Sequence, residues 1–468
     1  KKKPQNHSGG EEMILSSGKK VKKGIKEIQA TGEVLTARAG LGIFSQYIES
    51  QIWLMQLLQS CDGKGSRKGL HPGEQLRQTL LNCIDGTSTH LSVFDEKCAD
   101  PSYAPLIGAD KLLSTSSAKR MLAHMKPRTI RRIIEMSFMK RLKKEKAPYI
   151  KLDLDTVVFE NNSSQTREGC SVTYKRVKGF QPLMMKWNGY VVAAQFREGK
   201  AHSNHGDDAV KMIENVVSVI RKAVRVPVIL TADGGFFDQE IMKCCETLNI
   251  GYVIGGKQFR NIRERVQSIP EDEFSIFRRD DDSLNEWYYT EFMDKRDNWN
   301  KERRLVVTQL RSIGDQMIIP GMGRMSLSYT NLGTDPELMC SLADAGVDYL
   351  AETENIIMLA HNRGEDELTH RHIKDFATRE QLPCKDFDMN HTYFEIMILA
   401  FNLYESFKRD CLNGVMSAGS YPEKVRRKFI DTAGRIVKTA RKTILAVPRI
   451  IMEQLSLSEV WQRAAVPA

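Results

Sequence analysis

Hydrophobic residues recur every three or four positions through the first third of the chain, which is the spacing of one face of an α-helix. A clear run of this kind consists of Phe44, Ile48, Ile52, Met55 and Leu58. The Ser-Thr-Ser-Ser tetrad at residues 114–117 is typical of a helix N-cap, and we expect the helix to run to Met125. This spacing predicts a small helical bundle over residues 31–146.

Alternating apolar and polar residues begin abruptly at Tyr149, and such alternation is typical of β-strands. One strand is expected within residues 149–159 and two more within residues 184–196, joined by a turn at Asn188-Gly189. The elements expected next alternate helix and strand, over residues 207–224, 226–233, 238–248 and 251–254. This order is typical of an α/β layer, which we place at residues 147–260.

The pattern changes again over residues 261–340, where the expected strands are polar and rich in aromatic residues. We interpret this segment as a β-rich insertion. Helical spacing returns over residues 341–408 and continues through residues 409–468, a basic C-terminal region expected to be helical. Residues 1–30 are rich in lysine and glycine and have no apolar core, so we expect a basic disordered arm rather than a secretory signal.

Composition adds a charge imbalance to this outline. The 468 residues include 69 Lys and Arg against 59 Asp and Glu, a net charge of +10, which favours a polyanionic partner. The nine cysteines are scattered without a C-x-x-C pair, so reduced intracellular thiols are expected. No apolar run approaches the roughly 18 residues of a membrane helix, so we expect no membrane span.

Two carboxylates stand where the α/β layer is expected to carry a site. Asp155 lies near the end of the first strand, and Asp233 ends the buried strand just before two glycines. Ligands of α/β sheets bind at strand ends, and carboxylate oxygens suit Mg²⁺ or Mn²⁺. A capping or loop role remains the alternative for each residue. Asp153 competes with Asp155, because residues two apart on a strand share one face.

A third carboxylate is expected for two-metal phosphodiester chemistry. The candidate is Glu367, which is flanked by Arg363 four residues before it and Lys374 seven residues after it. On a helix these three side chains lie along one stripe, where the carboxylate could bind metal and the cations could hold phosphates. A surface ladder of salt bridges is the alternative.

These segments, in order, resemble the motifs of DDE transposases from bacterial insertion sequences. The motifs are Leu154-Asp155-Thr156, Gly199-Lys-Ala-His-Ser203 with Gly206, Leu230-Thr-Ala-Asp233, Gly251-Tyr-Val-Ile254, and Arg363 with Glu367 and Lys374. They are most similar to the group whose ribonuclease H-like core is interrupted by a β-rich insertion, with a Tyr-Arg-Glu-Lys signature. In this chain the tyrosine position is Ala360. The gaps of 78 (233 − 155) and 134 (367 − 233) residues accommodate an insertion in the second interval.

The resemblance implies an α/β ribonuclease H-like catalytic core, built from residues 147–260 and 341–408, interrupted by the insertion and flanked by N-terminal and C-terminal helical regions. It implies that Asp155, Asp233 and Glu367 are catalytic and hold Mg²⁺, for which Mn²⁺ can substitute. The activity implied is cleavage of the terminal inverted repeats of an insertion sequence and transfer of the 3′-OH ends to target DNA.

Partners follow from the same resemblance and from the charge. The expected partner is double-stranded DNA, bound by a homodimer in a bacterial cytoplasm and associated with the nucleoid, with residues 31–146 binding the DNA ends. The residues expected to contact DNA are Arg363, Lys374, Lys257, Arg131 and Arg132. For the basic helix at residues 127–146, a solvated surface is the alternative to contact with phosphates.

Two alternative functions remain open. A catalytically inactive, transposase-derived DNA-binding protein is the main alternative, and a nuclease without strand transfer is another. An ATPase is not expected, because the glycine-lysine stretches at residues 63–69 and 255–257 lack P-loop spacing. His202, Ser203 and His205 have neither a nucleophile elbow nor a third metal ligand, so a loop role is expected.

Overall fold

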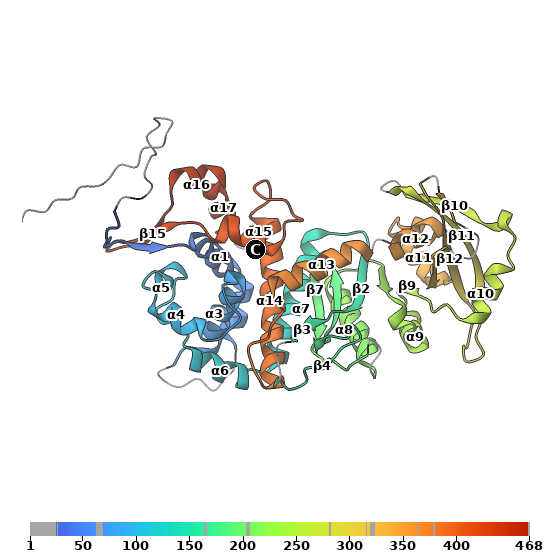
Figure 1. Ribbon diagram of the computed structural model, residues 1–468, viewed down its shortest axis with the longest axis horizontal. Helices are drawn as coiled ribbons and strands as arrows, with labels where there is room; N and C mark the ends of the chain where they lie inside the picture. The colour runs from blue at the N-terminus through green and yellow to red at the C-terminus, as the bar shows by residue number, and fades with distance from the viewer. Residues whose placement is uncertain are drawn as a thin grey trace, which may run out of the picture.

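The computed structural model of the chain is mixed α/β with one large sheet, as expected (Figure 1). The structure describes residues 25, 27–61, 69–162, 166–202, 206–279, 282–314, 316–318, 323–361, 363–377 and 380–466, and the side chains of 279, 282–284 and 363–367 are also outside its description. Most of the expected basic arm, the glycine-lysine stretch near residue 65, Ser203 and His205 therefore lie outside the described residues. No described helix is long and apolar enough to cross a membrane.

The N-terminal region is helical, as its periodicity predicts. Its helices are α1 (Ala39–Ser50), α2 (Ile52–Gln59), α3 (Pro72–Asp85), α4 (Val93–Ala99), α5 (Tyr103–Leu106), α6 (Thr115–His124) and α7 (Pro127–Glu145). The Ser114 side chain accepts a hydrogen bond from the Ser117 N–H and so caps α6 at the predicted place. These helices form the blue and cyan part of the molecule in Figure 1.

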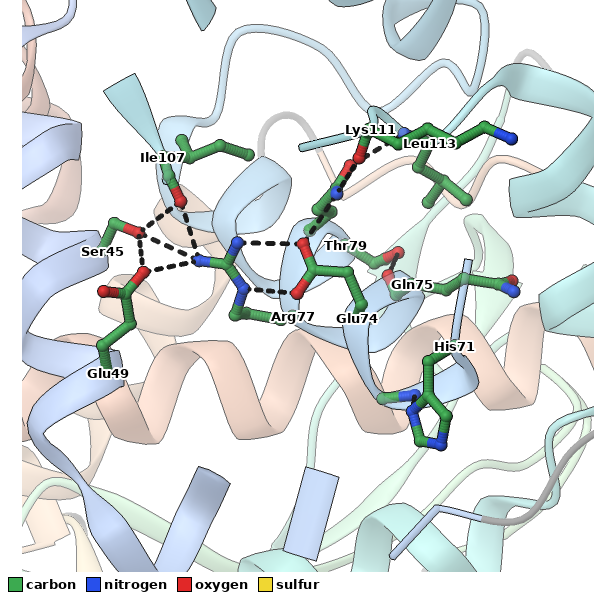
Figure 2. Close-up of polar contacts among 12 residues, drawn as sticks. Ser45, Glu49, His71, Glu74, Gln75, Arg77, Thr79, Ile107, Lys111 and Leu113 are labelled. Atoms are coloured by element: carbon green, nitrogen blue, oxygen red, sulfur yellow. Dashed lines mark hydrogen bonds and ion pairs between the residues drawn. The ribbon is translucent and has the colours of Figure 1, made fainter. Parts of the chain in front are cut away.

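A buried arginine ties three parts of this bundle together (Figure 2). Arg77 of α3 donates both Nε and Nη2 to the Glu74 carboxylate, at 2.7 and 2.9 Å. Its Nη1 donates to Glu49 of α1 at 3.1 Å and to the Ile107 carbonyl at 2.9 Å. Burial raises the pKa of Glu49, which Arg77 opposes. The guanidinium has enough partners to lie in the interior without an unpaired charge.

The central sheet has the strand order β10-β11-β12-β14-β9-β8-β2-β6-β7. Its core strands are β2 (Ile150–Thr156), β6 (Leu183–Trp187), β7 (Tyr190–Gln195), β8 (Val228–Ala232) and β9 (Gly251–Gly255). The neighbours β2, β8 and β9 run parallel, whereas β6 and β7 form an antiparallel hairpin beside β2. The hairpin turns at Asn188-Gly189, where both residues have positive φ, at 47° and 78°.

The segment expected as an insertion continues this sheet. Its strands are β10 (Ser275–Arg279), β11 (Asp282–Asp294), β12 (Arg303–Ile313), β13 (Gln316–Met317) and β14 (Met325–Thr330). Strand β14 pairs with β9 in antiparallel fashion, with Ser328 opposite Gly255. The insertion strands therefore extend the core sheet, and together with α10 (Arg260–Gln267), α11 (Pro336–Asp344) and α12 (Thr353–His361) they form the right-hand lobe of Figure 1.

Helices cover both faces of the core strands. On one face, Met184 of β6 and Val191 of β7 pack in a core with Phe401 of α14 (Phe387–Asp410), the long helix that separates the N-terminal bundle from the sheet in Figure 1. On the other face, Leu152 and Leu154 of β2 pack with α7, with α8 (Asp208–Ala223) and with α9 (Gln239–Thr247). A small sheet of β3 (Phe159–Glu160), β5 (Lys178–Phe180) and β4 (Ser171–Val172) lies beyond the end of β2.

The C-terminal region differs from the expected helices. Strands β15 (Gly434–Lys438) and β16 (Thr443–Ala446) form a hairpin that pairs with β1 (Val34–Thr36). Helices are confined to α15 (Pro422–Val425), a π-helical turn at Arg426–Ile430, α16 (Arg449–Gln454) and α17 (Leu457–Ala464). The physical reason is that residues 436–445 are rich in β-branched side chains, which favour strands, and that β15 pairs with β1, some 400 positions earlier in the chain.

Candidate active site

The register of the sheet places Asp155 and Asp233 side by side. Strands β2 and β8 are parallel, and Leu154 lies opposite Ala232, so the two aspartates are the next residues on neighbouring strands. Neighbouring strands are about 4.8 Å apart. Both aspartates line one cavity of about 980 Å³ at the carboxyl ends of these strands. This is the edge at which the sequence predicts a site.

Backbone amides fix one oxygen of each carboxylate. The Asp155 Oδ1 atom accepts from the Thr156 N–H at 2.7 Å, and the Asp233 Oδ1 atom accepts from the Gly235 N–H at 2.8 Å. Asp233 thereby caps the short 3₁₀ turn Gly234–Phe236. Asp233 therefore both caps this turn, as the alternative interpretation expected, and lines the cavity. Such bonds restrict side-chain rotation and hold the carboxylates at the cavity wall.

Asp153 occupies a different environment from Asp155. Its side chain is buried and forms an ion pair with Lys186 of β6 at 2.7 Å. The Thr231 hydroxyl also donates to its Oδ1 atom, at 3.1 Å. A lysine and an aspartate in the interior are tolerated because they pair with each other. Burial and pairing, which strand periodicity does not reveal, therefore distinguish the two aspartates.

A histidine of α13 (Arg363–Phe376) lies close both to Lys186 of this ion pair and to Asp155 at the cavity. The Lys186 Nζ atom lies 2.8 Å from the His370 Nε2 atom, which is 3.6 Å from the Asp155 Oδ2 atom. An ammonium group can only donate, so Nε2 acts as the acceptor and the imidazole proton is assigned to Nδ1. The contact between Lys186 and His370 attaches α13 to the sheet beside Asp155.

Helix α13 contains the third expected carboxylate, at position 367, and its flanking cations, at positions 363 and 374. Position 367 lies one turn before His370 on this helix, but the side chains of Glu367 and Arg363 are outside the description. Lys374 lines the cavity, and its Nζ atom donates to Glu380 at 3.0 Å. The helix expected from the sequence is therefore present at the cavity.

The cavity wall also includes residues that the sequence did not single out. Tyr174, which follows β4, lines it, and burial together with the charges of Asp155 and Asp233 raises the pKa of its hydroxyl. Arg324, just before β14, also lines it. Neither residue falls in a recognisable motif. His370 could have been suspected, because it lies three residues after Glu367 on a predicted helix.

The residue at the signature tyrosine position belongs to the same cavity. Ala360 and His361, at the end of α12, both line it. The His361 ring makes an edge contact with the ring of Trp287 from β11, with centroids 5.2 Å apart. Strand β11 and helix α12 therefore both contribute to the lining of this cavity.

The other residues expected to contact DNA are dispersed. Lys257 is exposed directly after β9, next to cavity-lining glycines. Arg132 is exposed on α7. Arg131 instead donates its Nε to the buried Glu395 of α14 at 2.8 Å, and so forms part of the contact between α7 and α14. The structure does not bring Arg131 and Arg132 to the cavity.

The carboxylate oxygens of Asp155 and Asp233, which the structure describes, are suitable ligands for a hard cation. Within the described residues, no group of three or more His, Cys, Asp or Glu side chains is arranged to hold a metal ion. Two aspartates on adjacent strand ends supply the oxygen ligands that Mg²⁺ prefers. A third ligand from α13 would complete a site of this kind, and the Glu367 side chain lies outside the described part.

Comparisons with known proteins are as follows. The family model described as "Transposase DDE domain group 1" matches residues 18–465. Among solved structures, the chain is similar to piggyBac transposase in a synaptic complex with hairpin DNA, determined by cryo-electron microscopy. That match has 12% sequence identity and a TM-score of 0.39, and it covers 84% of this chain and 80% of the other. No protein of curated function matches the chain.

Proposed function

Because the chain belongs to the group 1 family of transposase DDE domains, we propose that it is a DNA transposase of a bacterial insertion sequence. It would bind the terminal inverted repeats, cleave them by metal-dependent hydrolysis and join the 3′-OH ends to target DNA. The observation that carries this proposal is the position of Asp155 and Asp233 on adjacent strand ends in one large polar cavity.

We assign the strands β2, β6, β7, β8 and β9 with their helices to a ribonuclease H-like core, over residues 147–260 and 341–408. Residues 261–340 are the insertion, residues 31–146 the DNA-end-binding region and residues 409–468 the basic C-terminal region. The order of elements in the described chain supports these boundaries, because the strand-rich segment follows β9 along the chain and its last paired strand, β14, lies next to β9 in the sheet.

The triad of the proposal is Asp155, Asp233 and Glu367. These residues would hold two Mg²⁺ ions, or Mn²⁺, which when bound supply a charge that activates the attacking oxygen and stabilises the leaving one. The Thr156 and Gly235 amides hold the two aspartates in fixed orientations. The Lys186 Nζ atom lies 2.8 Å from the His370 Nε2 atom and would hold His370 beside Asp155.

Cations from two different segments that line the cavity would hold the DNA backbone. Lys374 on α13 and Arg324 before β14 both line it, and we propose that they bind phosphates on the two sides of the scissile bond, with Arg363 beside Lys374. Lys257 would contact the backbone just outside. In this arrangement the fixed charges orient the phosphodiester, while the carboxylates act at the reacting oxygens.

We further propose that two copies of the chain act on the paired DNA ends in a bacterial cytoplasm, as the resemblance to insertion-sequence transposases implies. The second candidate function is a DNA-binding protein derived from a transposase that no longer cleaves. The alanine at position 360 favours it, because this cavity-lining position carries tyrosine in the signature.

Cleavage of DNA that carries the element's own ends tests the proposal. The wild type is compared with Asp155→Asn, Asp233→Asn and Glu367→Gln in Mg²⁺, Mn²⁺ or EDTA, and with Glu214→Gln, a control at an exposed position of α8. We expect metal-dependent cleavage by the wild type and the control. The three triad variants should bind DNA without cutting it. Cleavage by a triad variant would refute the assignment, and binding without cleavage by every protein would favour the second candidate.

A further inference from the structure

A second cavity lies away from the candidate active site and is strongly basic. It measures about 810 Å³ and is lined by residues of α1, α2, α7, α14 and α17. We call it the α7 groove. Its lining cations are Lys140, Arg141, Lys143, Lys144, Arg409 and Arg463, and the acidic residue in its lining is Asp410.

Part of this charge is neutralised within the protein. Arg141, which is buried, and Lys144 both pair with Asp410, at 3.0 and 2.9 Å. Arg409 pairs with Glu145 at 3.3 Å, and Arg463 pairs with Glu459 at 3.2 Å.

Two further lysines line the groove and are not neutralised in this way. Lys140 and Lys143 are exposed on α7 and have no carboxylate partner within the described residues. The six lining cations are matched by three carboxylates, so the groove keeps an excess of positive charge.

Hydrogen bonds and ion pairs hold several residues that line the groove in place. The Tyr47 hydroxyl of α1 donates to the Asp410 Oδ2 atom at 3.2 Å, on the same carboxylate that binds Arg141. The Lys140 Nζ atom lies 6.0 Å from the centre of the Trp53 ring, at the limit of a cation–π contact. These contacts thus fix part of the lining, while the ammonium groups of Lys140 and Lys143 are exposed. A lining held in this way lowers the entropy lost when an anion binds.

The groove is separate from the carboxylate cavity. Arg409 donates to the carbonyl of Asn188, in the turn that ends β6. Met184 of β6 pairs with Asp155, and the four residue steps from Met184 to Asn188 span about 13 Å. Asp155 lies beside one end of β6, and the groove lies beyond its other end. A polyanion bound in the groove therefore contacts the protein away from Asp155.

We propose that the α7 groove binds the phosphate backbone of double-stranded DNA, on a segment other than the one held at Asp155 and Asp233. The cations come from three helices and are spread along the groove, which suits a line of phosphates better than a single small anion. Lysine ammonium groups act as point charges, so the contact is independent of base sequence. This inference rests on the proposed transposase function and adds to it a second DNA contact.

The test is the salt dependence of DNA binding by the full chain. A 30-base-pair duplex carrying an element end is titrated at several NaCl concentrations against the wild type, Lys140→Ala/Lys143→Ala and Lys140→Arg/Lys143→Arg. The control is Lys211→Ala/Lys222→Ala, which removes the same charge from exposed positions of α8. Each phosphate contact contributes about 0.9 to the slope of log K against log salt concentration. We expect the alanine pair to lower the slope by about 1 to 2 and the affinity by about tenfold or more.

The remaining variants complete the test. The arginine pair and the α8 control should keep the wild-type slope. An unchanged slope in the alanine pair, with a wild type that binds and cleaves, would overturn the groove while leaving the transposase function intact. An equal loss in the arginine pair would also overturn it, because charge would not be the cause. A wild type that binds no DNA would overturn both proposals.

Discussion

Replacement of Lys186 by methionine is expected to destabilise the sheet at the candidate active site. The substitution keeps the length of the side chain but leaves the Asp153 carboxylate buried without the ammonium group that lies 2.7 Å away. Both side chains are almost fully buried, at 1% and 2% exposure, so water cannot replace the lost partner. Removal of one member of such a pair costs about 3–5 kcal/mol. At about 1.4 kcal/mol for each factor of ten, the opening equilibrium of β2 and β6 increases by roughly 10² to 10⁴.

Hydrogen exchange read by mass spectrometry measures this change where it occurs. Peptides that cover β2 and β6 should exchange faster in Lys186→Met by that factor, while those of the distant β15–β16 hairpin should change least. Lys222→Met, an exposed lysine of α8, is the matched control and should leave the protection of β2 unchanged. Unaltered exchange in β2 and β6 of Lys186→Met would refute the reasoning.

A double variant separates stability from positioning. Asp153→Leu with Lys186→Met removes both charges together, so most of the lost protection should return. The contact between Lys186 and His370 remains absent, so α13 stays detached from the sheet at this point. We therefore expect DNA cleavage to stay low in the double variant. Recovery of full cleavage would show that His370 and Lys186 have no positioning role.

Three further outcomes are expected. Gly255→Ala should reduce cleavage strongly, because a Cβ atom there would lie 2.7 Å from the Gly234 N atom and displace the Asp233 turn, whereas Gly234→Ala, whose nearest neighbour is 3.6 Å away, should retain activity in the same assay. Burial, with help from Lys408, lowers the pKa of His372 from 6.5 to about 4. The unfolded chain then binds the extra proton, so stability falls as the pH falls from about 6.5 to 4, and chemical unfolding midpoints of His372→Gln should lose that part of the dependence. Mg²⁺ should raise the melting temperature of the wild type and have less effect on Asp233→Asn, as followed by calorimetry.

The regular elements of the fold were predictable from local patterns. The cap at Ser114, the hairpin turn at Asn188-Gly189 and the helices of the first third follow from short-range chemistry. The continuation of the core sheet into the insertion was not predictable, because the pairing of β14 with β9 joins residues more than 70 positions apart. The C-terminal hairpin was misread as helix, since its partner strand lies at the other end of the chain.

The position of Asp155, Asp233 and Lys374 at one cavity agrees with the sequence pattern, whereas their surroundings could not be predicted. The strand ends at Asp155 and Asp233 and the helix of Lys374 lie at one cavity, while the roles assigned to them remain predictions. The choice between Asp153 and Asp155 depends on Lys186, a lysine inside a strand whose burial no local pattern indicates. The basic helix predicted phosphate contact for Arg131, but in the tertiary structure its guanidinium donates to Glu395 of α14.

The pairing of β9 with β14 has a consequence for the nascent chain. On the ribosome, β9 is complete 75 residues (330 − 255) before the end of β14 is made, which takes about 4–15 s at 5–20 residues per second. During that time β9, with its buried Tyr252 and Ile254, is an open sheet edge that can pair with another chain. In the folded chain β14 covers this edge of β9. Removal of β14 should therefore leave the edge of β9 open to pairing with another chain.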